Sequence, residues 1–468
     1  MARTGIGYVV MALTTTYFLL WAVTQLGMAI VSVVAMRRHQ RRQSHRARAL
    51  VERVAPPWVS VIAPAYNEAL TIVDSVRAML ALDYEPREIV VVNDGSTDET
   101  LALLRQTFSL VPAPLAYEQP LPSAPVRGVY RSVAEPSLVV VDKENGKAKA
   151  DASNAGINAA SGELVLVIDA DTVLEPDALT RAVLPFLDDS TTIAVGATVA
   201  IVNGCVVEHG RLTSIALPRS WFARWQIVEY MRAFVMFRVA CAASNSLLIL
   251  SGAFGLFKRD AVIAVGGYDR TAIGEDMDLT IRLQRYHRAR RIPFRIQFDP
   301  SPLCATQAPE DIASLRSQRW RWRRGLMQSM WRYRDMLCRP RYGVVGLGSF
   351  PYTFLFEGLA PLLEFSCYVL ATLAFLLGAY DWRHYVVVVL IWSLLGTSVS
   401  MTAVLLSDIG TRRYMKGTDL VRLVLVALLE NYGYRQLNTW WSFVGTIQAL
   451  TGKGGWGTMK RRAFQNAA

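Results

Sequence analysis

Two carboxylates directly follow a strongly apolar run of the chain. Asp169 and Asp171, separated by one alanine, come after the run 164–168. A continuous Val/Ile/Leu run is typical of a buried parallel strand, and open α/β sheets bind ligands at the carboxyl ends of such strands. Paired carboxylates there suit Mg²⁺ or Mn²⁺ bridging to phosphate oxygens. A helix cap or a solvated turn is the alternative explanation.

Two other turns carry groups that could hold a nucleotide. Asp94 follows the apolar run 89–92 and precedes a glycine, so its carboxylate could accept hydrogen bonds from a nucleobase or a ribose. An Asx turn without a ligand explains the same residues. Lys147 lies beside Gly146 and could meet a phosphate or a base, although a solvated basic turn is the default interpretation.

Glu275 and Asp276 open a predicted helix that continues to Leu283. Either carboxylate could take a proton in acid–base catalysis. Acidic residues also favour first helical turns because of the helix dipole alone, so both interpretations stay open.

The segment 318–325 alternates tryptophans and arginines. Helical spacing places Gln318, Arg321 and Trp322 near one another. Trp322 offers a flat platform for a sugar ring and Arg321 a fork for a phosphate. A basic amphipathic helix at a membrane surface is the alternative, and the two roles are compatible.

Short apolar runs and helical stretches alternate in the segments that position these motifs. Strands are predicted at 59–64, 88–92 and 164–168. One helix is predicted over 68–81, and residues 158–161 end another helix before the last of these strands. Such alternation predicts a parallel sheet with right-handed crossovers. The polar groups lie in the loops after the strands, as in a nucleotide-binding domain and unlike a transporter core.

Apolar segments on both sides of this region predict membrane helices. Residues 5–36 carry no charge and are long enough to cross a bilayer core of about 30 Å. Arginines follow from Arg37 onwards, which predicts a cytoplasmic end, whereas a signal peptide would carry its basic region before the apolar stretch. Residues 352–380 and 385–407 predict a helical hairpin, and 420–429 an interfacial segment.

The formal charge of +12 fits anionic lipid headgroups and an anionic substrate, and no feature calls for nucleic acid. The five cysteines are scattered without metal spacing, so we assign them no role.

Taken in order, the motifs resemble those of the family 2 processive glycosyltransferases, a group that includes cellulose, chitin, hyaluronan and poly-N-acetylglucosamine synthases. The matching segments are Ala-Pro-Ala-Tyr-Asn-Glu (63–68), Asn-Asp-Gly-Ser (93–96), Asp-Ala-Asp (169–171), Ser-Gly-Ala-Phe-Gly (251–255), Gly-Glu-Asp (274–276), Gln-x-x-Arg-Trp (318–322) and Trp-Gly-Thr (456–458). The Gly-Glu-Asp segment replaces the Thr-Glu-Asp of cellulose-type enzymes and looks closer to the hyaluronan and chitin group.

The resemblance implies an α/β fold of the GT-A type, a nucleotide-sugar-binding domain with a parallel-rich central sheet flanked by transmembrane and interfacial helices. It implies these domains: an N-terminal membrane helix (1–36), a basic cytoplasmic linker (37–57), a cytoplasmic catalytic domain (58–335), membrane and interfacial helices (336–450) and a cytoplasmic tail like a gating loop (451–468).

The resemblance also implies roles for single residues. Asp276 would be the catalytic base and Asp171 would hold Mg²⁺ or Mn²⁺. The nucleotide would be bound by Tyr66, Glu68, Asp94, Lys147, Asp169, Arg321, Trp456 and Arg461. The acceptor would be bound by Gly252, Phe254, Glu275, Gln318 and Trp322.

The implied activity is inverting synthesis of a β-linked polysaccharide from a UDP-sugar, at the inner membrane of a bacterial-type cell. UDP-N-acetylglucosamine is the favoured donor, the growing polysaccharide is the acceptor, and accessory export or regulatory subunits are compatible. A β-glucan or hyaluronan-like product, or transfer of one sugar to a lipid carrier, is the alternative enzyme. A non-catalytic scaffold is disfavoured because Asp169, Asp171, Asp276 and Arg321 are all present.

Overall fold

The computed structural model describes residues 2–51, 55–113, 117–170, 172–208, 211–379, 381–411 and 417–451. Its main sheet contains β1 (Val59–Ala65), β2 (Arg87–Asp94), β3 (Leu110–Pro112), β4 (Val126–Ser132), β5 (Leu138–Lys143), β6 (Leu164–Val167), β7 (Val173–Leu174), β8 (Thr192–Ile201), β11 (Gly255–Lys258) and β12 (Arg295–Thr306). The ten strands lie in the order β3-β4-β5-β2-β1-β6-β11-β8-β12-β7. A separate hairpin pairs β9 (Val206–Glu208) with β10 (Arg211–Ser214).

The middle of the sheet is parallel. Strands β5, β2, β1 and β6 are neighbours that run in the same direction, and the three strands predicted from the sequence are β1, β2 and β6. Their residues are almost all buried, as expected when both faces of a parallel sheet are covered. Antiparallel β4 and β11 border this middle and make the whole sheet mixed. The α/β class with a parallel core is therefore confirmed.

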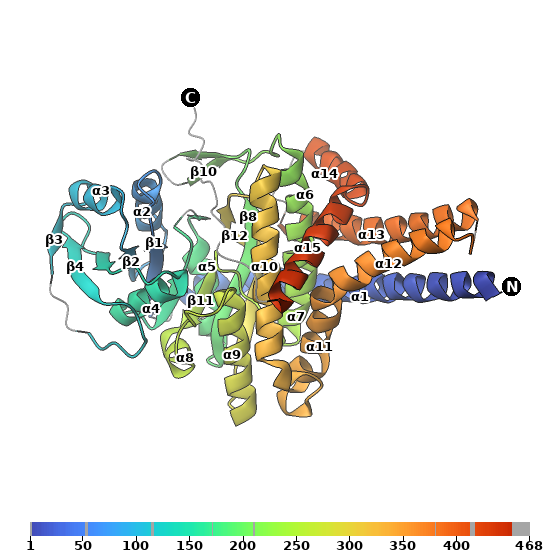
Figure 1. Cartoon of the computed structure of the whole chain (residues 1–468). Coiled ribbons are helices and arrows are strands. Elements are labelled where there is room, and N and C mark those ends of the chain that lie inside the picture. Colours follow the sequence, from blue (N-terminus) through green and yellow to red (C-terminus); the bar gives the residue numbers. More distant parts are fainter. Residues whose placement is uncertain are drawn as a thin grey trace.

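The helices fall into two groups, one that lies around the sheet and one that forms a helical bundle beside it (Figure 1). Around the sheet lie α2 (Ile72–Leu80), α3 (Thr100–Thr107), α4 (Lys149–Ala159), α5 (Ala178–Asp188), α8 (Arg259–Ala264) and α9 (Glu275–Arg290). Towards the bundle lie α6 (Trp221–Tyr230), π-helical η1 (Met231–Arg238), α7 (Val239–Ala243), α10 (Ile312–Arg332), the short turns η2 (Arg334–Met336) and η3 (Pro340–Tyr342), π-helical η4 (Val345–Ser349), α11 (Phe350–Tyr352), π-helical η5 (Thr353–Gly358), α14 (Gly417–Glu430) and α15 (Tyr434–Leu450).

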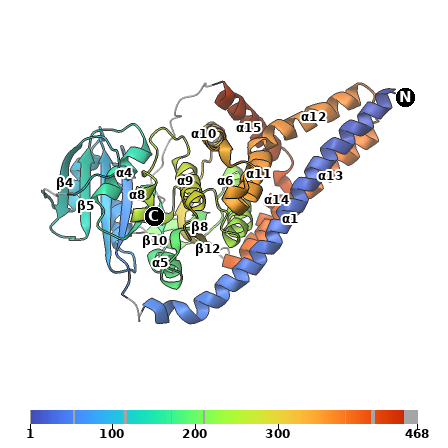
Figure 2. The ribbon, with the colours of Figure 1, turned by 90° about the horizontal axis from the view of Figure 1, so that it is seen from below.

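Three long apolar helices extend away from the sheet. Helices α1 (Ala2–Val51), α12 (Ala360–Leu376) and α13 (Trp382–Thr411) lie side by side in both views (Figures 1 and 2). By length and composition, α1 over Tyr8–Gln40 and α13 over Trp382–Ile409 could each cross a membrane. The segment Val345–Gly358 and α12 meet at a bend of 43°, and together they would form a third span if the bent pair is taken as one. Helix α1 continues to Val51, so the arginines that follow residue 36 prolong the same helix.

Helix α10 lies between the two parts of the molecule. It packs along α15 on one side and contacts α9 on the other (Figure 1). The contact with α15 is close, because a β-carbon added at Gly445 would lie 3.1 Å from Cβ of Arg323 and 3.4 Å from Cα of Trp320. The segment 318–325 therefore joins the sheet domain to the helices of the bundle.

Candidate active site

Lys149 connects carboxylates that come from two separate motifs. Its Nζ donates to Asp169 Oδ1 at 2.6 Å and to the Gly252 carbonyl oxygen at 2.9 Å. The Gly252 N–H donates in turn to Asp276 Oδ2 at 3.1 Å. The aspartate predicted to lie by the nucleotide is therefore joined to the predicted base through one lysine side chain and the backbone of one glycine.

The sheet order explains why these residues meet. Asp169 follows the carboxyl end of β6, and the antiparallel strand β11 begins with Gly255 opposite Val167. The turn that contains Gly252 is thus carried to the edge where Asp169 lies. Asp276 belongs to the first turn of α9, and its Oδ1 also accepts from the Met277 N–H at 2.8 Å. Free N–H groups and the helix dipole both favour a negative charge at that position.

The charges in this cluster shift the pKa values of two of its members, Glu275 and Lys149. Burial, and after it the nearby charge of Asp276, raises the pKa of Glu275 to about 7. Burial acts to lower the pKa of Lys149, but the carboxylates of Asp169 and Glu275 outweigh it and leave that pKa above its ordinary value. One fixed positive charge therefore lies among three acidic side chains, one of which holds a proton at neutral pH for part of the time.

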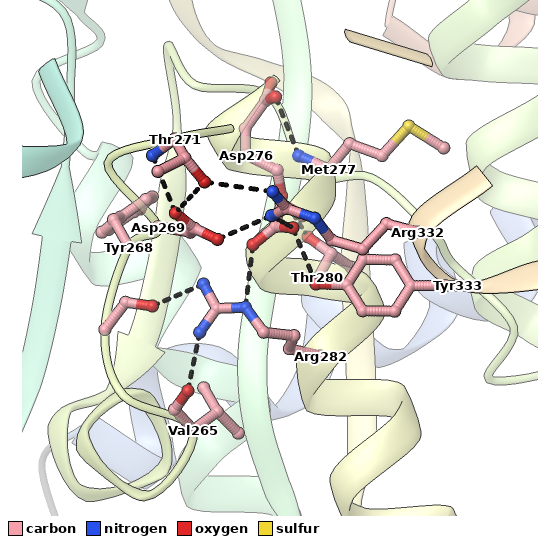
Figure 3. A network of polar contacts seen from close by, with 12 residues as sticks. Val265, Tyr268, Asp269, Thr271, Asp276, Met277, Thr280, Arg282, Arg332 and Tyr333 are labelled. Carbon is pink, nitrogen blue, oxygen red and sulfur yellow. Dashed lines mark hydrogen bonds and ion pairs between the residues drawn. The ribbon is translucent and has the colours of Figure 1, made fainter. Parts of the chain in front are cut away.

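An ion network around the buried carboxylate of Asp278 holds α9, the helix that carries Asp276 (Figure 3). The Asp278 carboxylate is buried and accepts from Arg282 Nε at 2.8 Å, from an Arg332 nitrogen at 3.1 Å and from the Tyr333 hydroxyl at 2.7 Å. Arg332 also pairs with Asp269 at 2.6 Å. Because Arg332 and Tyr333 come from α10 and its end, the network ties α9 and the loop before it to α10.

Helix α10 also packs directly on the turn that precedes Asp276. A β-carbon added at Gly325 would lie 3.0 Å from the backbone nitrogen of Gly274 and 3.2 Å from its Cα. Three residues further along α10, Gln328 accepts from the Ile273 N–H at 2.8 Å and donates to the Thr271 carbonyl at 3.1 Å. The position of Asp276 therefore depends on a glycine in α10.

The predicted acceptor residues of α10 differ in their surroundings. Gln318 is buried, and its Oε1 has no hydrogen-bond partner within the described ranges. Trp322 is 40% exposed, with Tyr230 at a ring-centroid distance of 6.5 Å and the Arg319 guanidinium 4.9 Å from its ring. A buried amide oxygen without a donor and a half-open indole face both suit a hydroxylated ligand. Arg321 is half-buried on the same helix.

The predicted nucleotide residues lie at the same edge of the sheet as Asp169. Tyr66 and Glu68 follow β1, and Asp94 ends the neighbouring strand β2. Tyr66 is 48% exposed, whereas Glu68 is buried and accepts from the Thr71 hydroxyl at 3.2 Å. Asp94 is buried, pairs with Lys143 and accepts from the Gly146 N–H at 3.0 Å.

Two lysines close in sequence occupy different environments. Lys147 is exposed, with a φ of 60°, and its N–H donates to Asn145 Oδ1 at 2.7 Å. Helix α4 begins only at Lys149, whose side chain reaches the carboxylates. Sequence reasoning named Lys147 and missed Lys149, and the structure joins Lys149, not Lys147, to Asp169.

Some predicted residues have no accessible side chain or lie elsewhere. The ring of Phe254 is fully buried in the core, so in this structure it shapes the turn that holds Gly252 and offers no face to an acceptor. Asp171, Trp456 and Arg461 lie outside the described residues, and their predicted roles stay predictions.

The donor set at the site is compatible with a hard divalent cation. Within the described ranges no three His, Cys, Asp or Glu side chains are grouped closely enough to hold a metal. The carboxylate of Asp169 is 39% exposed, and oxygen atoms of this kind are the ligands that Mg²⁺ and Mn²⁺ take. A metal that bridges to a diphosphate needs only one or two protein carboxylates, so these residues fit that kind of site.

Comparison with known proteins gives consistent matches. A family model described as "Glycosyltransferase like family 2" matches residues 124–325, and one described as "Glycosyl transferase family 2" matches residues 60–121. The poly-beta-1,6-N-acetyl-D-glucosamine synthase of Staphylococcus aureus strain COL is 27% identical over 306 residues, which are 65% of this chain and 62% of that protein. The Staphylococcus epidermidis synthase is 27% identical over 277 residues, 58% of this chain and 56% of the relative.

The chain thus spans about 62% of the length of the first of these curated relatives. Among solved structures, a mannosyltransferase from Pyrobaculum calidifontis, in complex with GDP-Man and Mn²⁺, matches with a TM-score of 0.50 at 20% identity. That match covers 88% of this chain and 99% of the other. At this level of identity the likeness shows a shared fold.

Proposed function

Because the chain belongs to the family 2 glycosyltransferases, we propose that it polymerises a β-linked polysaccharide from a UDP-sugar and moves the product across a membrane. The favoured donor is UDP-N-acetylglucosamine, since the curated relatives are named as synthases of poly-β-1,6-N-acetylglucosamine. The observation that carries the proposal is the hydrogen-bonded connection from Asp169 through Lys149 and Gly252 to Asp276. It joins the carboxylate predicted to lie by the nucleotide to the predicted base, and this connection supports the proposal.

Asp276 acts as the base in this proposal. A sugar hydroxyl is a weak nucleophile, and a positioned carboxylate that takes its proton contributes roughly 10²–10⁴-fold to the rate. The Gly252 and Met277 N–H groups hold the two oxygens of Asp276 in place. The acceptor oxygen forms a bond to the anomeric carbon while the bond from that carbon to the UDP phosphate breaks. One displacement inverts the configuration, so an α-linked donor gives a β-linked product.

Lys149 and Arg321 supply positive charge for the departing UDP. Fixed charges aimed at developing negative charge are among the largest contributions to catalysis. A bound Mg²⁺ or Mn²⁺, held by Asp171 with Asp169 beside it, would neutralise charge on the diphosphate. Tyr66, Glu68 and Asp94 bind the uridine, and Trp456 and Arg461 close over the nucleotide.

The acceptor side is formed by α10 and the turn before β11. Trp322 provides the platform on which a sugar ring stacks, and the unpaired Oε1 of Gln318 accepts a hydrogen bond from a sugar hydroxyl. Because α10 packs along α15 and its Arg323 donates to backbone carbonyls at Glu357 and Gly358, the acceptor site lies next to the helices that precede α12. A cytoplasmic catalytic domain would then deliver polymer directly to α1, α12 and α13.

The test is UDP release by purified protein with Mg²⁺ or Mn²⁺, followed by sizing of the product. UDP-N-acetylglucosamine, UDP-glucose and UDP-glucuronate are offered singly and in pairs, and chelator-treated protein serves as the metal-free arm. We expect turnover with UDP-N-acetylglucosamine alone and a product of many sugars. Asp276→Asn should lower turnover about 10²–10⁴-fold while UDP still binds.

Asp260 supplies the matched control, since it lies exposed in the first turn of α8 as Asp276 lies in the first turn of α9. Asp260→Asn should turn over at the wild-type rate. Turnover that survives in Asp276→Asn removes Asp276 as the base. A product of one sugar on a lipid supports the lipid-carrier alternative, and turnover only with a donor pair indicates a heteropolymer. If no donor leads to UDP release, the result contradicts the proposed activity of the isolated chain.

A further inference from the structure

Lys143 is a buried charge that the mechanism above does not use. It ends β5, and in the sheet register it lies opposite Asp94 at the end of β2. Its side chain has 0% exposure. Its Nζ contacts the Asp94 carboxylate, Asp151 Oδ1 at 2.6 Å and the Glu144 carbonyl oxygen at 2.6 Å. Three acceptors therefore satisfy the three N–H donors of one ammonium group.

The carboxylate on the far side of Lys143 is equally well held. Asp151 lies in α4, is fully buried, and accepts from the Ala124 N–H at 3.0 and 3.1 Å. Arg270 pairs with its other oxygen at 3.0 Å. Taking charges out of water is costly, and replacing a buried ion pair by apolar residues is often neutral or stabilising. The folding of the sheet edge alone therefore gives little reason for so many charges.

The hydrogen bonds to the Asp94 carboxylate reach only one of its two oxygens in the described part of the chain. Lys143 and the Gly146 N–H, at 3.0 Å, both bind Oδ1. Over the described part of the chain, the structure gives Oδ2 no hydrogen bond or ion pair. Two donors on one oxygen fix the rotation of the carboxylate and leave the second oxygen for a ligand.

We propose that Lys143 is a positioning residue of the donor site, which holds Asp94 so that its Oδ2 accepts a hydrogen bond from the uridine of the nucleotide. The inference rests on the proposed function, because it takes Asp94 as a ligand of uridine. Lys143 itself does not touch the nucleotide. It acts through Asp94, so its removal should weaken nucleotide binding and leave the maximal rate of sugar transfer nearly unchanged.

The experiment compares UDP affinity, turnover and thermal unfolding in full-length variants. Lys143→Met leaves two buried carboxylates without their shared cation and is expected to lower the unfolding temperature. The double variant Lys143→Met/Asp151→Asn removes one charge of each sign, so the net charge of the cluster stays that of the wild type. In this variant Asp94 loses its lysine partner without a change of net charge, so a change in UDP affinity can be told apart from a loss of stability. Lys258→Met is the control, because the Lys258 ammonium donates to the Ser190 carbonyl oxygen at 2.6 Å in an exposed hydrogen bond.

We expect the double variant to unfold near the wild-type temperature and to bind UDP about ten- to a hundredfold more weakly, as for loss of a hydrogen bond to a charged group. At saturating UDP-sugar its rate should stay within about threefold of the wild type, in keeping with lost ground-state binding. Lys258→Met should bind and turn over normally.

A folded double variant with wild-type UDP affinity overturns the proposal. So does a double variant that does not fold, since that result assigns Lys143 to folding. Wild-type protein that binds UDP but releases none from any UDP-sugar contradicts the proposed function alone, and the affinity comparison still decides the role of Lys143. Wild-type protein that binds no UDP contradicts both.

Discussion

Gly325 provides a test of how α10 positions the base. A β-carbon at this position would lie 3.0 Å from the Gly274 nitrogen, whereas ordinary contacts begin at 3.4 Å. The backbone must therefore move by about 0.4 Å in Gly325→Ala, the difference between the two distances. Gly274 directly precedes Glu275 and Asp276, so the movement is passed to the base. If a misplacement of about 1 Å costs roughly 10²-fold, 0.4 Å corresponds to about sixfold.

The effect on stability should be small because two contributions oppose each other. Replacing glycine by alanine inside a helix stabilises by about 1 kcal/mol, and overpacking costs about 1–3 kcal/mol. UDP release at saturating donor should fall about sixfold, with UDP affinity kept and the unfolding temperature nearly unchanged. Gly27→Ala is the control, since a β-carbon at Gly27 of α1 would meet nothing within 4 Å. Wild-type turnover in Gly325→Ala would show that the contact does not position the base.

Two other substitutions test the charges around Asp276. Lys149→Met should lower the rate of UDP release about 10²–10³-fold, as expected when a fixed charge on the leaving group is removed; an unchanged rate at saturating donor would exclude Lys149 from the reaction. Burial and the charge of Asp276 raise the pKa of Glu275 from its ordinary 4.5 to about 7 in the folded protein. The stability that Glu275 contributes is therefore complete below pH 4.5 and is lost as the pH rises through about 7. The wild-type unfolding temperature should therefore fall more steeply across this window than that of Glu275→Gln, and parallel curves would contradict the raised pKa.

The parallel core of the fold was predictable from short stretches of sequence. Strands β1, β2 and β6 are buried on both faces, so their residues form continuous apolar runs that identify them without further information. The GT-A type of fold inferred from the motif order is likewise confirmed by the family match and by the solved mannosyltransferase. Strands β8 and β12 were not predicted, and their pairing joins segments about a hundred residues apart.

The candidate site was predictable only in part. Asp169 follows an apolar strand and Asp276 lies in the acidic first turn of a helix, and the sequence marks both places clearly. Lys147 and Lys149 differ by two positions, and the choice between them depends on where α4 begins. Lys147 has a left-handed backbone, which a helix does not allow, and α4 begins two residues later at Lys149. No local pattern predicts this, because lysine is not a residue that favours such a conformation.

The loop before α9 explains why no single motif could locate the base. Arg270 pairs with Asp151 at 3.0 Å on the donor side, and its neighbour Asp269 pairs with Arg332 of α10 at 2.6 Å. The loop is therefore held from both sides a few residues before Asp276. One ion pair comes from the half of the domain that includes the donor strands and the other from the helix that carries the acceptor residues, so the loop that leads to the base contacts both halves. Each motif contributes chemistry, and contacts between distant segments, such as Gly325 with Gly274 and Arg332 with Asp269, position the turn that carries the base.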